Sequence, residues 1–371
     1  METLTNSAAP NGAPPNPAWA TLTMATCNLL NLALPGRLFY ENQEPYDAEE
    51  YQRKIAWLGL QLRRLSADVV ATQEVWDLAA LRDAVTESGL RYPAVIAPGA
   101  EQGALGTPRV GLLTRLEVVS VRSIAEFPPG AAVDVPELGP HAHFERPVLH
   151  ALLRLKHGQP LHVLVAHLKS KRPKFLQNAR GELIEDRDDP RVAARATLRS
   201  LVMRASEAAA LRGHLVELLH RTRDPVVLMG DLNDAPHAVT SQIVAATSSV
   251  AYDKQARDTA LFHAYEVQSE PALRRDVAYS HVHQGWPETL DQIWVSEEFV
   301  SGSRFALGDV RRVEYFNDHL HESRERVRSD HGFVRALLRV ALPPFERLQG
   351  QAAAGPPPAG AQQTRAGPAL A

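Results

Sequence analysis

Four short, mostly apolar runs in this chain lead directly into polar residues. Residues 22–27 precede Asn28, residues 68–72 precede Gln73-Glu74, residues 161–166 precede His167, and residues 225–229 precede Gly230-Asp231. Apolar runs of four to eight residues are typical of buried strands. We therefore expect these polar side chains to follow strand ends and to project into one shared cleft.

The remaining apolar patterns predict a fold rich in strands. Further strands are expected at residues 110–113, 118–124, 148–155, 292–295 and 333–340. Residues 49–65 carry Ile55, Leu58, Leu62 and Leu65 at helical spacing, and residues 193–219 form a second, longer helical pattern. Many strands with few helices indicate an α/β fold in which sheets pack face to face and helices flank them.

Composition sets broad limits on the class of protein. The chain has 371 residues, 44% hydrophobic and 22% charged, so it is long enough for one large domain or two ordinary ones with a sizeable core. Its net charge of −3 does not indicate a nucleic-acid-binding module, although a locally basic rim would be compatible with an enzyme acting on nucleic acid. The single cysteine, Cys27, excludes an intramolecular disulfide.

The two ends differ in composition from the body of the chain. Residues 1–18 are rich in Pro, Asn and Ala, and residues 346–371 are rich in Ala, Pro and Gly. Such segments bury too little apolar surface to offset their ordering entropy, so we expect two disordered tails around one folded domain at residues 19–345. No secretory signal or membrane span is recognisable, which predicts a cytoplasmic protein without stable membrane association; no protein partner can be inferred.

Several polar residues have the chemistry that phosphodiester hydrolysis requires. Asn28, Glu74 and Asp330 are oxygen donors suited to a hard divalent cation such as Mg²⁺, which keeps several waters and needs few protein ligands. Asp231 and Asn233 lie two residues apart and would face the same side of an extended backbone. The carboxylate could orient or deprotonate a water, while the amide donates to a phosphate oxygen.

Two histidines complete this candidate site. His167 and His331 could donate to one phosphoryl group, and Asp291 could fix the tautomer or raise the basicity of a histidine. Each residue alone has an ordinary explanation, since residues 230–236 could form only a turn. Their joint occurrence at predicted strand ends favours a catalytic site.

The order of these motifs resembles the endonuclease/exonuclease/phosphatase superfamily, which has a DNase-I-like fold. The resemblance covers roughly residues 20–340 and rests on Asn28, Gln73-Glu74, His167, the Gly-Asp-x-Asn motif at 230–233, Asp291 and Ser329-Asp330-His331. It implies a four-layer α/β/β/α sandwich with a Mg²⁺ or Mn²⁺ site at one edge of two central sheets.

The resemblance also implies roles for individual residues. Glu74 would be the main metal ligand, assisted by Asn28 and Asp330. Asp231 would position the nucleophilic water, and Asp291 would pair with His331, which contacts the scissile phosphate. Which of Asp231 and His331 takes the proton stays open.

Local motifs favour one branch of this superfamily. Residues 28–32 and 167–171 are similar to motifs of bacterial nucleases of the extracellular type, although the chain lacks their signal sequence and paired cysteines. The primary prediction is therefore a metal-dependent nuclease, an endonuclease, with nucleic acid as substrate. Lys169 and Lys171 follow His167 and could bind its phosphates. Trp286 and Trp294 flank Asp291 and could stack on a base, although tryptophans more often pack in cores.

Two alternatives use the same residues differently. One is a phosphodiesterase or phosphatase for a lipid or small-molecule phosphate, similar to a sphingomyelinase or an inositol phosphatase. The other is a non-catalytic binding module on the same fold. A zinc site is not expected, because the His-x-His pairs at 141–143 and 281–283 lack a convincing third ligand. The arginines between residues 311 and 328 alternate with acids and are typical of an ion-paired surface.

Overall fold

The fold is described from a computed structural model of the chain. It describes residues 18–40, 43–250, 253–270, 275–322 and 324–342. Residues 20–340 form one compact unit, and the chain ends are assigned to a second one, in which the Leu342 amide donates to the Ala18 carbonyl oxygen at 2.7 Å. The predicted tails at 1–18 and 346–371 fall almost entirely outside the described residues, so the domain boundaries stay predictions.

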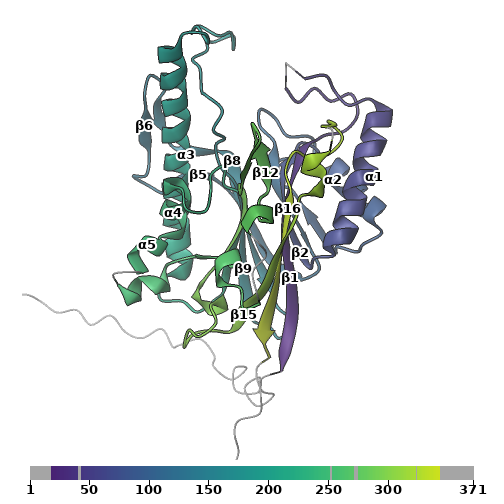
Figure 1. The fold of residues 1–371 in the computed structure, drawn as a ribbon, viewed down its shortest axis with the longest axis vertical. Coiled ribbons are helices and arrows are strands. Elements are labelled where there is room, and N and C mark those ends of the chain that lie inside the picture. The colour runs from purple at the N-terminus through teal and green to yellow at the C-terminus, as the bar shows by residue number, and fades with distance from the viewer. Residues whose placement is uncertain (1–17, 41–42, 251–252, 271–274, 323, 343–371) are drawn as a thin grey trace, which may run out of the picture. The chain divides into compact units, whose positions relative to one another are not determined.

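Two six-stranded sheets form the centre of the compact unit (Figure 1). The first sheet has the order β15-β16-β1-β2-β4-β3, and the second has the order β11-β14-β10-β9-β8-β5. The strands of the first sheet are β1 (Trp19–Leu32), β2 (Val69–Val75), β3 (Ala94–Ile96), β4 (Arg109–Thr114), β15 (Gly308–Phe316) and β16 (Phe333–Ala341). Those of the second are β5 (Glu117–Glu126), β8 (His143–Arg154), β9 (Pro160–His167), β10 (Val226–Asp231), β11 (Phe262–His263) and β14 (Asp291–Val295).

Helices and two small hairpins complete the described fold. The α-helices are α1 (Ala48–Leu65), α2 (Leu78–Ser88), α3 (Pro190–Leu219), α4 (Val239–Ala245), α5 (Thr247–Val250) and α6 (Ala264–Val267). The 3₁₀ helices are η1 (Lys254–Asp258), η2 (Arg275–Val277), η3 (Glu297–Phe299) and η4 (Asp318–His321). The hairpins are β6 (Val133–Val135) with β7 (Gly139–His141), and β12 (His281–His283) with β13 (Trp286–Glu288).

Three apolar clusters account for the layering. One lies between α1, α2 and the first sheet, a second between the two sheets, and a third between the second sheet and α3 with α4 (Figure 1). Along β9, Val163 and Val165 enter the cluster between the sheets, while Leu164 and Ala166 enter the cluster beneath α3. Side chains alternate across a strand, so a strand buried on both faces reads as a continuous apolar run. This explains why these strands were recognisable in the sequence, and it confirms the predicted α/β/β/α sandwich.

The predicted elements are present, but strand ends differ and the structure contains further elements. β1 and β2 continue past the predicted ends at residues 27 and 72, so Asn28 and Glu74 lie within strands rather than after them. The elements that were not predicted include α2, α4, α5, α6, β3, β6, β7, β11, β12, β13 and β15. Among the described residues, no helix has the length and apolarity to cross a membrane.

Candidate active site

Three adjacent strands of the second sheet bring a histidine and two aspartates into line. β9 and β10 are parallel and β10 and β14 are antiparallel, and in this register His167 pairs with Asp231, which pairs with Asp291. All three side chains are buried. The His167 Nε2 atom lies 3.4 Å from Asp231 Oδ2. The parallel β9–β10 pair therefore explains why two distant strand-end motifs meet.

The first sheet contributes Asn28 and Glu74 across the parallel β1–β2 pair. The Asn28 amide nitrogen lies 3.3 Å from Glu74 Oε1 and 3.2 Å from Asp231 Oδ2, so it joins the two sheets. The Asn31 amide donates to Glu74 Oε2 at 2.9 Å. Both strands are irregular here, since Glu74, Asn31 and Leu30 have φ values of 62°, 51° and 49°. Left-handed backbone at non-glycine residues is uncommon and clusters at functional sites.

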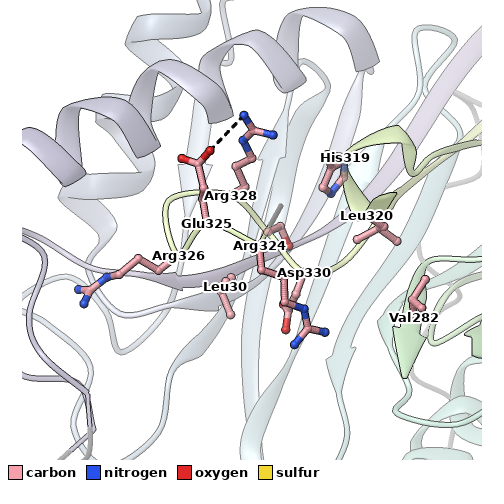
Figure 2. Close-up of a pocket in the computed structure, with 10 residues that line it drawn as sticks. Leu30, Val282, His319, Leu320, Arg324, Glu325, Arg326, Arg328 and Asp330 are labelled. Atoms are coloured by element: carbon pink, nitrogen blue, oxygen red, sulfur yellow. Dashed lines mark ion pairs between the residues drawn. The ribbon is translucent and has the colours of Figure 1, made fainter. Parts of the chain in front are cut away.

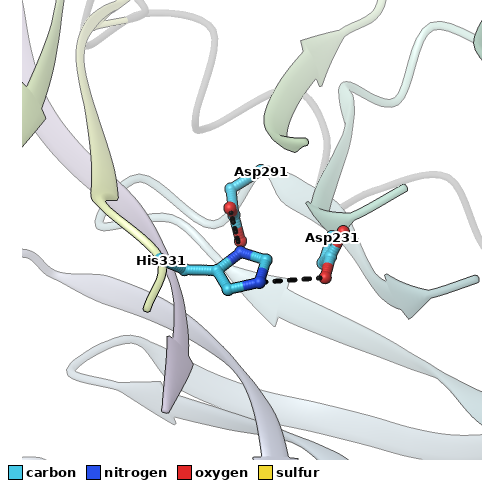
Figure 3. A group of neighbouring side chains, drawn as sticks. All are labelled: Asp231, Asp291 and His331. Atoms are coloured by element: carbon cyan, nitrogen blue, oxygen red, sulfur yellow. Dashed lines mark hydrogen bonds and ion pairs between the residues drawn. The ribbon is translucent and has the colours of Figure 1, made fainter. Parts of the chain in front are cut away.

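His331 closes the site from the loop that precedes β16. Its Nδ1 lies 2.7 Å from Asp291 Oδ2, and its Nε2 lies 4.0 Å from Asp231 Oδ2. Figure 3 shows the imidazole between the two carboxylates. The Ser329 hydroxyl donates to the Asn28 carbonyl oxygen at 2.7 Å and accepts from the His331 amide, which anchors the Ser-Asp-His motif to β1. The expected proximity of Asp291 and His331 is thus present in the structure.

Burial and neighbouring charges give these groups different proton affinities. Burial raises the pKa of Asp231 to about 7, against the opposing effect of His331. Burial alone would lower the pKa of His331, but the charge and hydrogen bond of Asp291 outweigh it and raise the pKa well above 6.5. Burial and the nearby Arg146 lower the pKa of His167 well below 6.5. At neutral pH, His331 is therefore an imidazolium and His167 a neutral imidazole, with Asp231 able to exchange a proton.

The Gly-Asp-x-Asn motif is a tight turn rather than an extended segment. Gly230 has φ = 146°, and a Cβ there would lie 1.9 Å from the Ala166 carbonyl oxygen, so only glycine fits against β9. Asn233 has φ = 54°, and its amide N–H donates to Asp231 Oδ1 at 2.8 Å. Its side-chain nitrogen donates to the Leu168 carbonyl oxygen at 2.9 Å. The pair is therefore brought together by the turn, which corrects the expected extended geometry.

The predicted metal ligands have a suitable donor chemistry. Within the described chain, Glu74 and Asp330 lie within 4.0 Å of no Lys, Arg or His nitrogen, and both line the same cavity. Carboxylates without a cationic partner beside a cavity fit a hard divalent cation. Asn28 fits less simply, because its Oδ1 already accepts the Leu30 amide at 3.1 Å and retains one further lone pair.

Asp231, Asp291 and His331 form another candidate metal-binding group. They offer one ligand atom each within 4.8 Å of one another, and they are the only such cluster in the part of the chain that the structure describes. The hydrogen bond between His331 Nδ1 and Asp291 Oδ2, at 2.7 Å, already pairs two of these three groups. We therefore interpret this group as a charge-paired catalytic set. No zinc cluster is found around the two His-x-His pairs within the same described residues.

The site opens into a cavity of about 990 Å³. Its floor carries the catalytic candidates, and its walls carry aromatic and basic residues. The polar and aromatic residues that line it include Tyr40, Glu74, Glu145, Arg146, His167, Lys169, Arg172, Lys174, Phe175, Arg187, Asp231, Asn233, Asp330 and His331. Asp330 and Leu30 also line a second cavity of about 260 Å³, whose lining includes Arg324, and Figure 2 shows an ion pair there between Glu325 and Arg328.

The two predicted substrate lysines have different surroundings. Lys169 is buried and lines the 990 Å³ cavity, and its Nζ has only weak contacts with oxygens of residues 170 and 172. Lys171 lies outside the cavity lining, and its Nζ is 2.6 Å from Glu288 Oε1 and 3.8 Å from Asp234 Oδ1. Its charge is therefore already balanced by the protein.

The other predicted surface features have clear positions. Trp294 is buried and donates to Gln292, whereas Trp286 is 76% exposed, and neither tryptophan lines the cavity. The arginines between 311 and 328 are mostly ion-paired, as expected: the pairs are Arg311–Glu270, Arg312–Glu314, Arg326–Glu50 and Arg328–Glu322.

Three residues of the site were not recognised in the sequence. Arg146 and Tyr40 line the cavity, and neither belongs to a motif that marks it. Lys54 is fully buried on α1, lies over the Tyr46 ring, and its ammonium has no hydrogen-bond partner among the described residues. Lys54 was detectable, because it interrupts the apolar stripe that includes Ile55 and Leu58.

Comparison with known proteins identifies the family. Residues 25–331 match the model of the Endonuclease/Exonuclease/phosphatase family. This chain belongs to that family. Its members are phosphoric ester hydrolases that generally use divalent metals, so the chain is a hydrolase of this superfamily. No curated protein matches the chain in sequence.

Solved structures agree with the family assignment at the level of the fold. The endonuclease/exonuclease/phosphatase from Bacteroides vulgatus is 14% identical, with a TM-score of 0.51, covering 86% of this chain and 99% of its own. A family protein from Bacteroides thetaiotaomicron is 16% identical, with a TM-score of 0.53 and coverage of 88% and 98%. Humanized TDP2 from D. rerio is 14% identical, with a TM-score of 0.51 and coverage of 86% and 98%.

Proposed function

We propose that this protein is a metal-dependent phosphodiester hydrolase that cleaves nucleic acid. The observation that carries the proposal is the arrangement of Asp231 between His167 and His331, at the floor of a cavity that also contains Glu74 and Asp330. A pKa of about 7 makes Asp231 a suitable acceptor for the proton of an attacking water. The acid–base, anion-binding and metal-binding groups that phosphodiester hydrolysis needs would thus meet at one place.

The imidazolium of His331 has a complementary role. Asp291 keeps His331 protonated, so its Nε2 proton would be donated to a non-bridging phosphoryl oxygen as negative charge develops there. The neutral His167 has a single ring N–H, and its Nε2, 3.4 Å from Asp231 Oδ2, would use it to orient that carboxylate. The Asn233 amide is bound to Leu168 and so fixes the turn that carries Asp231.

Glu74 and Asp330 would hold a divalent cation such as Mg²⁺ or Mn²⁺, with the remaining lone pair of Asn28 available to it. A bound cation would stabilise negative charge on the phosphoryl and leaving oxygens. The Asn28 and Asn31 donors would keep the Glu74 carboxylate oriented toward that cation.

A substrate panel tests the proposal. Purified protein is incubated with plasmid, single-stranded DNA, RNA, sphingomyelin and inositol phosphates in the presence of Mg²⁺ or Mn²⁺. We expect cleavage of nucleic acid that is lost with a chelator and in the Glu74→Ala and His331→Ala variants. Hydrolysis of only the lipid or the sugar phosphate would favour the alternative substrate class. Undiminished cleavage by either variant would reject the proposed site.

A further inference from the structure

The segment that joins β9 to α3 lies along that helix. The Lys169 amide donates to Glu207 Oε2 at 2.6 Å, and the Lys174 amide donates to the Ala196 carbonyl oxygen at 2.9 Å. Arg199 reinforces the second anchor through the Lys174 carbonyl oxygen at 3.1 Å. These anchors are eleven residues apart on α3, or about 16 Å at 1.5 Å per residue. The segment is therefore a fixed wall that extends away from the catalytic residues.

This wall and its neighbour β8 present positive charge to the cavity. The cation wall consists of Arg146, Lys169, Arg172, Lys174 and Arg187, all of which line the 990 Å³ cavity. In the described part of the chain, no side-chain nitrogen of these five residues lies within 4.0 Å of a carboxylate oxygen. Glu145 is the one carboxylate lining the cavity besides the catalytic candidates Glu74, Asp231 and Asp330.

The lack of ion pairs is not caused by a shortage of acidic residues. On the adjacent α3, Arg199 pairs with Glu185 at 2.8 Å, and Arg204 lies 3.4 Å from Asp234. Glu185 belongs to the same segment as the cation wall, yet it points to α3 rather than to the cavity cations. Positive groups left without protein partners along a cavity are suited to an anionic ligand that supplies several charges.

Aromatic side chains accompany these charges. Tyr40 and Phe175 line the cavity, and the Arg187 guanidinium lies 5.5 Å from the centre of the Phe175 ring. A positive groove combined with aromatic faces is how proteins bind single-stranded nucleic acid, because the backbone meets cations while unpaired bases stack.

We propose that the cation wall binds the backbone of single-stranded nucleic acid leading into the catalytic centre, at phosphates beyond the one that is cleaved. This inference rests on the proposed function and names its substrate class. The double variant Lys174→Ala/Arg187→Ala removes two wall cations that form no ion pair with the catalytic carboxylates among the described residues. Arg180→Ala is the matched control, because Arg180 is exposed on the same segment and does not line the cavity.

The test compares a ten-nucleotide single strand with bis(p-nitrophenyl) phosphate, a small phosphodiester that is too short to extend along the anchored segment. We expect the double variant to lose about 10- to 100-fold in kcat/KM on the oligonucleotide at low salt and to keep its rate on the small substrate. The slope of log kcat/KM against log salt concentration should become shallower by about 1.4 in the double variant. Each phosphate contact in a single strand contributes about 0.7 to that slope, and two contacts are removed. The Arg180→Ala control should match the wild type on both substrates.

A binding measurement separates this inference from the proposed function. Fluorescence anisotropy of the labelled oligonucleotide is followed with Glu74→Ala protein, with and without the two wall substitutions. If the two wall substitutions weaken oligonucleotide binding at least tenfold, the cation wall binds the strand, whether or not the wild-type protein hydrolyses it. Equal binding, an equal loss on both catalytic substrates, or a duplex that binds as tightly as the single strand would overturn it. Absence of hydrolysis of every phosphodiester by the wild type would reject the proposed function alone.

Discussion

Two sets of charged side chains line one cavity, and they differ in whether the protein balances their charge. In the catalytic centre, Asp291 holds His331 at 2.7 Å, and Asp231 is contacted by Asn28 and His167. In the cation wall, no described carboxylate lies within ion-pair distance of Lys174 or Arg187.

This difference in charge balance matches two functions, catalysis in the centre and substrate binding along the wall. Buried partners in the centre fix a geometry before substrate arrives, which is how electrostatic catalysis avoids reorganisation during the reaction. Unpaired cations on an accessible wall remain free for an incoming anion and are screened by salt. Substitutions in the catalytic centre should therefore lower kcat/KM for every substrate. Substitutions in the cation wall should lower it only for long substrates.

The largest effect is expected from removing the imidazolium of the centre. His331→Ala should lower kcat/KM by about 10²–10⁴-fold, because general acid–base and anion-stabilising groups contribute on this scale. The loss should be equal for an oligonucleotide and for bis(p-nitrophenyl) phosphate. His143→Ala, which alters an exposed histidine, is the control and should retain full activity. A loss confined to the oligonucleotide would assign His331 to the wall instead.

A smaller effect, with a characteristic pH dependence, is expected from Asp291→Asn. Activity requires Asp231 without its proton and His331 with its proton, so the wild-type rate should rise through about pH 7 and fall only well above it. Without the Asp291 charge, burial lowers the pKa of His331, and the falling limb moves toward the rising one.

We expect Asp291→Asn to lose about 100-fold in kcat/KM at pH 8, with the loss growing as the pH rises. The measurement is kcat/KM for bis(p-nitrophenyl) phosphate between pH 5.5 and 9.5. If the pH profiles of the wild type and Asp291→Asn have the same shape and differ only in magnitude, the assigned pairing of Asp291 with His331 is contradicted. Urea unfolding of the variant checks that it remains folded.

The smallest effect concerns Lys54, a buried cation whose ammonium contacts the Tyr46 ring but has no hydrogen-bond partner among the described residues. Burial lowers its pKa from 10.5 to about 7 in the folded protein, despite opposing attraction from Glu74 and Asp330. Between these two values the unfolded chain binds more protons, so this group makes stability rise with pH. The rise should be about 2 kcal/mol between pH 7 and 9, at 1.36 kcal/mol per unit of pKa shift.

Lys54→Met should remove this slope and raise the free energy of unfolding at pH 7 by about 1–3 kcal/mol, because an uncompensated buried charge is replaced by an apolar group of similar volume. Urea unfolding in chelator at pH 7 and pH 9 measures both quantities. A variant that is less stable than the wild type at pH 7 would show that the ammonium has a compensating interaction in the folded protein.

The sequence predicted those elements whose burial leaves a pattern in their own residues. Strands β9 and β10 are buried on both faces, so their residues form continuous apolar runs that are visible without a structure. β15 was not predicted because Arg311 and Arg312 are adjacent at a register shift and break the apolar–polar alternation of this edge strand. Leu78, Leu81 and Val85 of α2 have helical spacing, so this helix was detectable in the sequence.

The site was predictable only where a motif marks it. Asp231 and His167 follow apolar runs, whereas Arg146 lies within β8 and reaches the cavity through tertiary packing alone. The left-handed backbone at Glu74 and Asn233 is also invisible in sequence, since neither residue is glycine. The same holds for the unpaired state of the wall, which depends on where Glu185 points.

The most direct test of the account is the metal dependence of bis(p-nitrophenyl) phosphate hydrolysis in wild-type and Glu74→Gln protein. Both proteins are stripped with a chelator, and Mg²⁺ or Mn²⁺ is then added back while the rate is measured. The account predicts no wild-type activity without metal, full recovery on addition, and a midpoint for Glu74→Gln at least 10- to 100-fold higher. Hydrolysis that survives chelation, or identical midpoints for the two proteins, would contradict it.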